Sequence, residues 1–317
     1  MPEAVTVELD AQYRQLREEC GLLDRSARGK LLFKGPEAAE YLQGQLTNDI
    51  EALELGEGCY AALLDRKGHM QADMRVLRIA DDEVLVDTEA EALPVARRHL
   101  EMYKVGREVE VEDVSEARAL LSLIGPRSAE LSGAPPLPEH AWKPLNVNGI
   151  GCLAVGTALG IDLFASAADR EQLRSALAEA GAVEVSPDAV EILRIEAGTP
   201  RFGAEMDSAT MPAEAGIVEA AVNFEKGCYI GQETVARLHY RGKPNRHLRG
   251  LRLSAPVAPG TRLLTDEKEV GRVGGSCVSP VRGPIALAIL RREAEPGAEL
   301  TVGEDGVTAQ VVDLPFG

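Results

Sequence analysis

Apolar residues recur along the first three quarters of the chain with two different periods. A spacing of three to four residues predicts amphipathic helices near 9–20, 36–46, 88–103, 169–180 and 186–197. Leu23 continues the first apolar stripe, and Asp24-Arg25-Ser26 then ends that helix. Thr88 is the predicted N-cap of the helix near 88–103. Ser186-Pro187-Asp188 provides a cap, a proline and an acid in the order typical of a helix start, here that of the helix near 186–197.

Short alternating runs predict strands between these helices, at 30–34, 59–64, 70–79, 83–87, near 109, and at 119–124, 152–155 and 161–164. After Arg249 the pattern changes, because short apolar runs then alternate with Gly, Pro and Asp turns and no helix is evident. We therefore predict an α+β protein with a helix-containing region at 1–240 and a separate antiparallel β-barrel domain at 245–317.

Composition narrows the class of protein. The chain has 317 residues, a net charge of −17, and no apolar run that approaches the roughly 20 residues of a membrane span. Its start lacks the features of a secretion signal, which predicts a cytoplasmic protein without a membrane partner. The five cysteines are scattered without a CxxC pair, so we expect neither a disulfide framework nor a metal site built from this chain alone.

The negative charge makes direct nucleic-acid binding by the whole surface unexpected. Locally the sign reverses, because residues 226–252 hold seven Lys and Arg side chains against one acid, Glu233. A basic island in an acidic protein suggests an anionic partner, such as a polyglutamate tail or a phosphate backbone. Pairing with acids elsewhere in the chain explains the same island, and both interpretations stay open.

The densest cluster of chemically useful residues is Lys226-Gly-Cys-Tyr-Ile-Gly-Gln-Glu233. Its two glycines, Gly227 and Gly231, can adopt positive φ and allow a close backbone approach. A helix is expected from Gln232, which would place Cys228 just before a helix start and two residues from Lys226. Both features lower a thiol pKa. The other interpretation makes Cys228 a small buried apolar residue, and Tyr229 is expected in the core.

These motifs resemble a known family. The octapeptide, together with Arg194-x-Glu196-Ala-Gly198, Pro212-x-Glu214-Ala-Gly216 and Val235-Ala-Arg237 followed by Arg241-Gly242, looks like the YgfZ-type folate-binding proteins, which are relatives of the glycine-cleavage T-protein. Asp24-Arg-Ser26, Leu42–Asp49 and Lys67-Gly68 agree with the same superfamily. The resemblance covers nearly the whole chain, and the octapeptide is its most specific part.

The resemblance implies α+β domains around a central channel, here two intertwined subdomains, with a C-terminal β-barrel. It implies that tetrahydrofolate or a derivative binds in the channel. It also implies support for iron–sulfur cluster assembly or repair in client enzymes, including enzymes that modify tRNA. Partners would then be folate, iron–sulfur enzymes or cluster-assembly proteins. Cys228 would be the functional thiol, and Glu196 would match a residue that hydrogen-bonds the pterin ring.

A folate site needs a buried carboxylate and bases. The pterin 2-amino group and N3–H form a donor edge that a carboxylate such as Glu196 matches with two hydrogen bonds. The alternative is that Glu196 is an ordinary acid at a helix end, paired with Arg194 or Arg201. Arg194 is also a candidate cofactor-binding residue. The candidates to bind the carboxylates of a glutamate tail are Arg237, Arg241 and Lys243. Gln232 or Glu233 can orient a group beside Cys228.

One departure from the T-protein pattern supports a rival interpretation. T-proteins carry a paired acid after the first hairpin glycine, whereas here only Asp73 remains. Asp73 is by default a solvated residue on an exposed strand. As an acid or base it would instead serve a folate-dependent aminomethyl or one-carbon transferase. A third interpretation is a tRNA-binding protein that uses the basic residues of 226–252.

Overall fold

The structure is a computed structural model that describes residues 3–316, and these residues form two compact units. Unit 1 contains the chain up to Leu64, residues Gln71–Pro187 and residues Ala221–Ile230. Unit 2 contains Asp65–Met70, Asp188–Ala220 and the chain from Gly231 onward. Each unit is thus assembled from segments that are distant in sequence. None of the helices among residues 3–316 combines the length and apolar character needed to span a bilayer.

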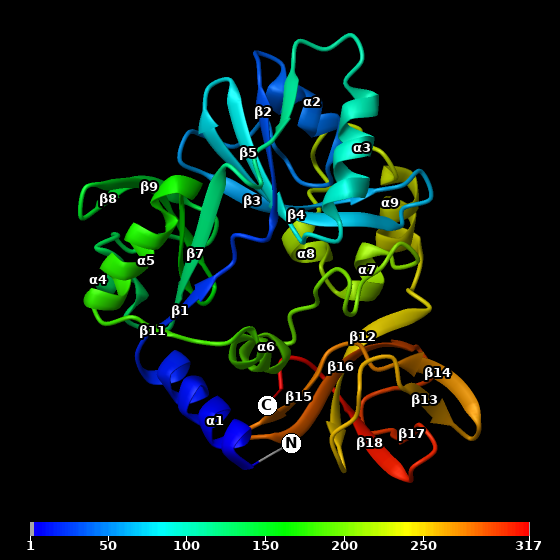
Figure 1. The fold of residues 1–317 in the computed structure, drawn as a ribbon. Coiled ribbons are helices and arrows are strands. Elements are labelled where there is room, and N and C mark those ends of the chain that lie inside the picture. The colour runs from blue at the N-terminus through cyan, green and yellow to red at the C-terminus, as the bar shows by residue number, and fades with distance from the viewer. Residues whose placement is uncertain (1–2, 317) are drawn as a thin grey trace. The chain divides into compact units, whose positions relative to one another are not determined.

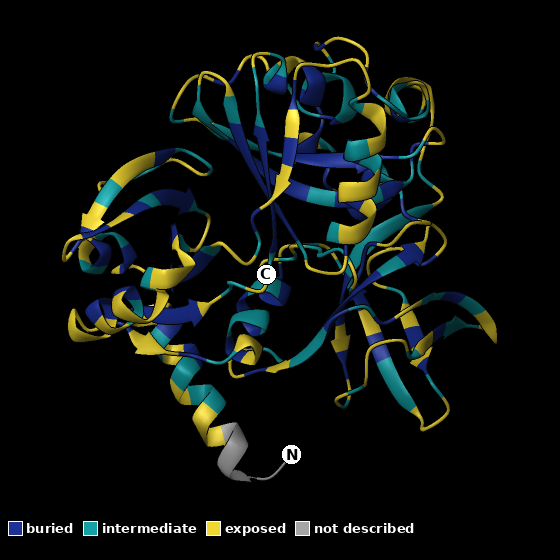
Figure 2. Cartoon of the chain, turned by 45° about the horizontal axis from the view of Figure 1, so that its top comes forward, coloured by how far each residue is buried: buried dark blue, intermediate teal, exposed yellow. Residues whose placement is uncertain are grey.

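The first sheet of unit 1 has five strands in the order β3-β4-β5-β2-β6 (Figure 1). They are β2 (Gly29–Lys34), β3 (Gly58–Leu64), β4 (Met70–Ala80), β5 (Glu83–Thr88) and β6 (Glu110–Asp113). Apolar residues set the register, since Phe33 lies opposite Val84 and Val111. Helices α2 (Ala38–Gln45) and α3 (Leu93–Tyr103) accompany the sheet, and α3 buries one side while the other is exposed (Figure 2).

The second sheet of unit 1 has six strands in the order β11-β1-β7-β10-β9-β8. They are β1 (Gly21–Asp24), β7 (Arg118–Ile124), β8 (Trp142–Val147), β9 (Ile150–Thr157), β10 (Gly160–Ser166) and β11 (Val183–Glu184). Helix α1 (Glu3–Glu18) precedes this sheet in sequence, and α4 (Ser128–Ser132), the 3-10 turn η1 (Ala167–Asp169) and α5 (Arg170–Glu179) contact its strands. Leu173 and Leu177 of α5 share a buried core with Leu121 and Leu163.

Unit 2 is built on a seven-stranded sheet in the order β14-β13-β17-β18-β12-β16-β15. Its strands are β12 (Arg246–Leu253), β13 (Arg262–Thr265), β14 (Lys268–Arg272), β15 (Ser276–Ser279), β16 (Gly283–Arg291), β17 (Glu299–Val302) and β18 (Val307–Val312). Its helices are α6 (Pro187–Glu196) and α8 (Val218–Ala221), each with one end at the unit boundary, and α7 (Pro212–Ala215) and α9 (Gln232–Arg241). Leu251, Leu263 and Val270 contribute to its core.

The predicted α+β class is confirmed, and so is the antiparallel character of the C-terminal region. Within residues 3–316 no helix follows Arg241, and the sheet of unit 2 is an antiparallel half-barrel. The predicted helices near 169–180 and from Pro187 are present as α5 and α6. Trp142, expected to be a packing residue, is buried, and its indole N–H donates to the Arg78 carbonyl at 2.9 Å.

Two predicted helix boundaries are wrong. Helix α1 ends at Glu18, and Leu23 lies in strand β1 opposite Ser122 of β7, so Asp24 does not end a helix. Thr88 ends strand β5 and does not cap α3, because its hydroxyl donates to the Asp73 carbonyl. Helix α3 begins at Leu93 with Pro94 in its first turn, where a missing N–H costs nothing.

Candidate functional site

Cys228 has the most exposed thiol of the five cysteines. It lies in the loop that precedes α9, which begins at Gln232 as predicted. Cys20 and Cys152 are buried, and Cys59 and Cys277 are half-buried. Burial raises the pKa of Cys20 and Cys152 to about 11 and that of Cys59 and Cys277 to about 12. The fold thus separates one accessible sulfur from four shielded ones.

The loop that carries Cys228 is anchored by the buried ammonium group of Lys226. Its Nζ donates to the backbone carbonyls of Gln43, Leu46 and Asn48, each at 2.7 Å. Two further bonds join the same segments, from the Thr47 hydroxyl to the Ala221 carbonyl and from the Asn223 N–H to the Thr47 carbonyl. The motif Leu42–Asp49 therefore contacts the segment from Ala221 to Lys226 within unit 1, although the two lie far apart in sequence.

These contacts give Lys226 a structural task that the sequence did not indicate. Three carbonyl acceptors match the three protons of an ammonium group. Burial lowers the pKa of Lys226 to about 8, which the nearby charges of Asp49 and Cys59 partly oppose. The Lys226 ammonium also lies 5.2 Å from the centroid of the Tyr229 ring. Its predicted influence on the Cys228 thiol stays a prediction.

The other residues of the octapeptide differ in environment. Tyr229 is 7% exposed, as expected of a core residue, and its buried hydroxyl makes no hydrogen bond with residues 3–316. Gly231 has a φ of 85°, the left-handed conformation predicted for it. Gly227 does not adopt positive φ, and a Cβ built there would meet nothing within 4 Å. Gln232 is half-buried and Glu233 exposed at the start of α9.

The exposure of Cys228 gives a direct chemical prediction. Iodoacetamide near pH 7 should alkylate the native protein once, at Cys228, because fewer than about one in a thousand of thiols with a pKa near 11 or 12 are ionised there. Intact-mass measurement followed by peptide mapping checks this. Cys228→Ser is the matched control and should remain unlabelled until denaturant is added. Labelling first at Cys59 or Cys277 would contradict the assignment.

Asp73 does not lie on an open, solvated strand as expected by default. Its side chain is half-buried in unit 1, and its Oδ2 accepts a hydrogen bond from the Tyr60 hydroxyl at 2.7 Å. Burial raises the pKa of Asp73, against the opposing effects of the Tyr60 hydrogen bond and the Arg28 charge. Burial also raises the pKa of Tyr60, and the charge of Asp73 adds to that rise. The arrangement suits a carboxyl group that exchanges a proton.

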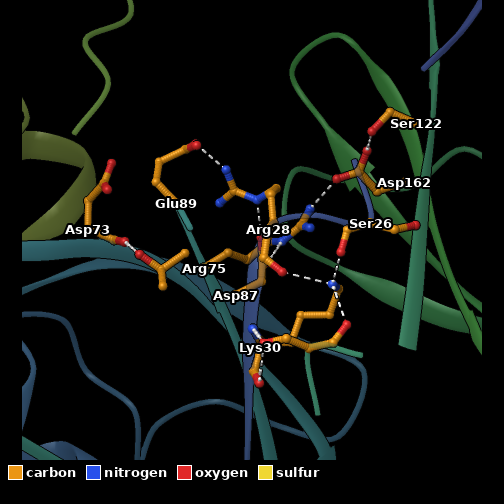
Figure 3. Close-up of polar contacts among 11 residues, drawn as sticks. Ser26, Arg28, Lys30, Asp73, Arg75, Asp87, Glu89, Ser122 and Asp162 are labelled. Carbon is orange, nitrogen blue, oxygen red and sulfur yellow. Dashed lines mark hydrogen bonds and ion pairs between the residues drawn. The ribbon is translucent and has the colours of Figure 1, made fainter. Parts of the chain in front are cut away.

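A buried charge network lies beside this pair (Figure 3). Asp87 is at its centre, accepting from the Arg75 Nε at 2.7 Å and from the Arg28 Nε at 2.8 Å. Arg75 also donates to Asp162 at 2.8 Å, and Asp162 accepts from the Ser122 hydroxyl at 2.6 Å. Arg75 comes from β4 of one sheet and Asp162 from β10 of the other, so the ion pairs join the two sheets of unit 1.

Unit 2 holds the predicted pterin carboxylate. Glu196, at the end of α6, is 7% exposed and accepts a hydrogen bond from the Ser279 hydroxyl at 2.5 Å. Arg194 lies two residues earlier and donates to Glu191 at 2.6 Å and to Glu205 at 2.9 Å. Its guanidinium is therefore already shared between two carboxylates, and a contact with a cofactor stays a prediction.

The basic segment 226–252 is partly paired within the chain. Arg246 pairs with Glu214 at 2.7 Å, and Arg249 lies 3.8 Å from Asp313. Arg237 and Arg241 of α9 are exposed, as is Lys243 after it. None of these three forms an ion pair with residues 3–316. Pairing within the chain thus explains Arg246 and Arg249, whereas the other three basic residues stay consistent with an anionic partner. Across the same residues no group of three or more His, Cys, Asp and Glu side chains is placed to hold a metal ion.

Two families match this chain. The GCVT N-terminal domain matches residues 3–226, and the glycine cleavage T-protein C-terminal barrel domain matches residues 246–316. The chain belongs to the glycine cleavage T-protein family. The T-protein superfamily predicted from the motifs is therefore confirmed, and the YgfZ type within it stays a prediction.

Relatives in the T-protein family are similar over nearly their whole length. A Rubrobacter xylanophilus protein named aminomethyltransferase is 30% identical over 97% of this chain and 86% of its own. One from Thermus thermophilus is 31% identical over 96% of this chain and 89% of its own. The crystal structure of glycine cleavage system aminomethyltransferase T from Bartonella henselae matches with a TM-score of 0.88 at 23% identity, over 98% of this chain and 89% of that one, and so supports the fold.

Proposed function

We propose that this T-protein family member is a YgfZ-type tetrahydrofolate-binding accessory protein for iron–sulfur cluster assembly or repair. Its support of tRNA modification would be indirect, through client enzymes. One observation carries the proposal: Cys228 presents an exposed thiol on a loop that Lys226 anchors, while burial shields the other four cysteines. A chain that keeps a single sulfur accessible on a fixed loop is suited to thiol chemistry rather than to packing.

Cys228 would act with a partner. A single cysteine does not hold an iron–sulfur cluster, which needs several thiolates, so a client or assembly protein would supply the other ligands. The same thiol can serve as a nucleophile or a redox relay. In each role the anchored loop restricts where the sulfur lies, and this lowers the entropy cost of meeting a partner.

The residues present fit a folate. Glu196 offers a buried carboxylate for the donor edge of the pterin ring, and Arg237 and Arg241 offer exposed guanidinium groups for tail carboxylates. A bound tetrahydrofolate would supply one-carbon chemistry at its N5 position. The chain's own contribution would be to orient the pterin through Glu196 and to balance the charge of the tail.

A folate-dependent aminomethyl or one-carbon transferase is the second candidate. The observation that favours it is the half-buried Asp73, whose pKa is raised by burial and whose carboxylate accepts a hydrogen bond from Tyr60, as suits a group that exchanges a proton. The relatives named aminomethyltransferase point the same way. Against it stands the single acid in this stretch, because Ala72 precedes Asp73 where T-proteins carry a paired acid.

Two substitutions separate the candidates. In a host that lacks this gene, Cys228→Ala should fail to restore the activity of iron–sulfur enzymes, while its melting temperature and its affinity for tetrahydrofolate stay unchanged. Cys59→Ala, which removes a half-buried thiol, is the matched control and should restore activity. Asp73→Asn should also restore activity under the accessory function. Under the transferase function it should instead lower turnover of an amine donor with tetrahydrofolate by about 100-fold or more.

Full restoration by Cys228→Ala would reject the accessory function. Measurable turnover of amine donors that vanishes in Asp73→Asn would support the transferase in its place. A protein that binds no tetrahydrofolate would reject both candidates.

A further inference from the structure

Helix α3 of unit 1 carries an exposed apolar face that the proposed function does not use. Val95 is 42% exposed and Met102 is 60% exposed, and Val105, just after the helix, is 87% exposed. Val95, Arg98 and Met102 follow one another at spacings of three and four residues, so they lie along one side of the helix. We call these three residues the α3 stripe. Single exposed apolar residues are ordinary, whereas several gathered on one face are typical of a contact surface.

The opposite side of α3 is fixed to the rest of unit 1. Ala96 and Leu100 are fully buried, and the helix contacts strands β2 and β6. The Tyr41 hydroxyl donates to the Leu100 carbonyl, and the His99 Nε2 lies 3.1 Å from the Gln45 Oε1. The other side of the helix stays exposed (Figure 2). A partner that docks on the stripe therefore has little of this helix to order.

The charges around the stripe indicate the sign of a partner. Arg97 and Arg107 each pair with two carboxylates, at distances between 2.8 and 3.1 Å. The side chains of Arg98 and Lys104 make no ion pair or hydrogen bond with the side chains of residues 7–316 or with the backbone of residues 3–316. Two positive charges beside the stripe are thus left without a counter-charge from these residues, although the chain has 51 acidic and only 34 basic residues.

These features favour an acidic protein over two other occupants. A second copy of the chain would place the Arg98 of each subunit against the same basic face of the other. An anionic membrane would attract Arg98 and Lys104, but it would repel the rest of a chain with a net charge of −17. An eleven-residue helix with two exposed apolar side chains also inserts little apolar area into a bilayer.

A helix is the element whose spacing matches the stripe. Val95 and Met102 are seven residues apart, which corresponds to about 10 Å along a helix axis. Apolar residues at i and i+7 of a facing helix have the same spacing, and an acid between them would meet Arg98. The unbranched side chain of Met102 adapts to partners of different shape.

We propose that α3 docks an amphipathic helix of a partner protein, which is apolar along the side that meets Val95 and Met102 and acidic beside it. Val95 and Met102 provide the apolar anchors, and Arg98 and Lys104 select an acidic partner. The docking surface lies wholly within unit 1 and depends neither on folate binding nor on Cys228.

Two synthetic peptides test this docking surface. The first is a stapled helix of about four turns with leucine at positions i, i+4 and i+7 and glutamate beside them, and the second has lysine in place of each glutamate. Fluorescence anisotropy measures their binding to the full chain. The glutamate peptide should bind at least about threefold more tightly than the lysine peptide. Met102→Asp should weaken its binding about tenfold or more, because an apolar anchor is lost and an acid is added.

Charge reversal gives the sharper result. Arg98→Glu should weaken binding of the glutamate peptide and strengthen that of the lysine peptide, so that the preference reverses. Arg66→Glu, the same change at an exposed arginine of the β3–β4 turn, is the matched control and should leave the preference unchanged. Val281→Asp, at a residue that is 72% exposed between β15 and β16, is the control for Met102→Asp. All four variants should keep the melting temperature of the wild type, because the altered side chains are exposed.

Equal binding of the two peptides, or a preference that survives Arg98→Glu, would overturn the proposal. A dimer in sedimentation velocity that Met102→Asp dissociates would assign the stripe to a second copy instead. Binding to phosphatidylglycerol vesicles that the same variant abolishes would assign it to a membrane, and either result also overturns the proposal. Should Met102→Asp melt below the wild type, the reversal in Arg98→Glu decides alone. None of these results affects the test of the accessory function by Cys228→Ala.

Discussion

Replacing Asp87 with alanine should lower the free energy of unfolding by about 3–5 kcal/mol, because it leaves two partly or fully buried arginines without their shared carboxylate. Asp87 is 2% exposed and holds Arg75 at 2.7 Å and Arg28 at 2.8 Å. Glu89 and Asp162 remain to take part of the two charges. Loss of the central carboxylate should also weaken the connection between the two sheets of unit 1.

Urea unfolding followed by circular dichroism measures this change. Asp82→Ala, which removes an exposed carboxylate before β5, is the matched control and should shift stability by no more than about 0.5 kcal/mol. A loss of less than about 1 kcal/mol in Asp87→Ala would show that the network reorganises around the gap and that Asp87 is not its centre.

Acidity gives a second test of the same carboxylate. Burial opposes ionisation of Asp87, but the charges and hydrogen bonds of Arg75 and Arg28 outweigh it and hold its pKa well below the ordinary value. A lowered folded-state pKa means that the stabilisation is present above about pH 4, the ordinary value for an aspartate, and is lost as the pH falls further. The wild type should lose stability below pH 4 more steeply than Asp87→Ala does.

Replacing Lys226 with methionine should cost about 2–4 kcal/mol of unfolding free energy. The substitution leaves the carbonyls of Gln43, Leu46 and Asn48 without the donor that reaches each at 2.7 Å. Methionine regains part of this cost, because burying the ammonium is itself unfavourable, as the lowering of its pKa to about 8 indicates. The unsatisfied carbonyls should dominate unless water reaches them.

The loop should report the change locally. Backbone amides of residues 223–226 should exchange hydrogen faster in Lys226→Met, and the alkylation rate of Cys228 should change with them. Lys67→Met, which alters an exposed lysine of the β3–β4 turn, is the control and should leave both unchanged. Unaltered stability and exchange in Lys226→Met would show that the three bonds contribute nothing to the loop.

Much of the fold is predictable because burial imposes a period on the sequence. Strand β2 carries a short continuous apolar run, Leu31 to Phe33, and helix α5 carries its apolar residues at a spacing of three to four; both lie where expected. Strand β8 was missed because Pro144 and exposed polar residues interrupt its pattern. Strands β15 and β17 are only four residues long, too short to show alternation.

The candidate site was less predictable, because its geometry depends on contacts between distant segments. Cys228 stood out by composition, but the acceptors of Lys226 lie about 180 residues earlier and nothing near it in sequence reveals them. Asp87 carries a signal in the sequence, because it follows an unbroken apolar run, Val84 to Val86, in a strand that is buried on both faces. Arg75 carries none, because alternation along β4 places it on the same face as Gln71 and Asp73.

Lys30 and Lys226 share one arrangement, a buried ammonium group in a cage of three backbone carbonyls. The Lys30 ammonium donates to the carbonyls of Ser26, Arg28 and Ser115, as that of Lys226 donates to those of Gln43, Leu46 and Asn48. Since main-chain oxygens are the same for every amino acid, neighbouring side chains can vary without disturbing either cage. Cys228, which is exposed on the loop that Lys226 fixes, can thus change independently of the contacts that position it. Among diverging relatives, we expect the caged lysines to persist where the exposed cysteine has been replaced by another residue.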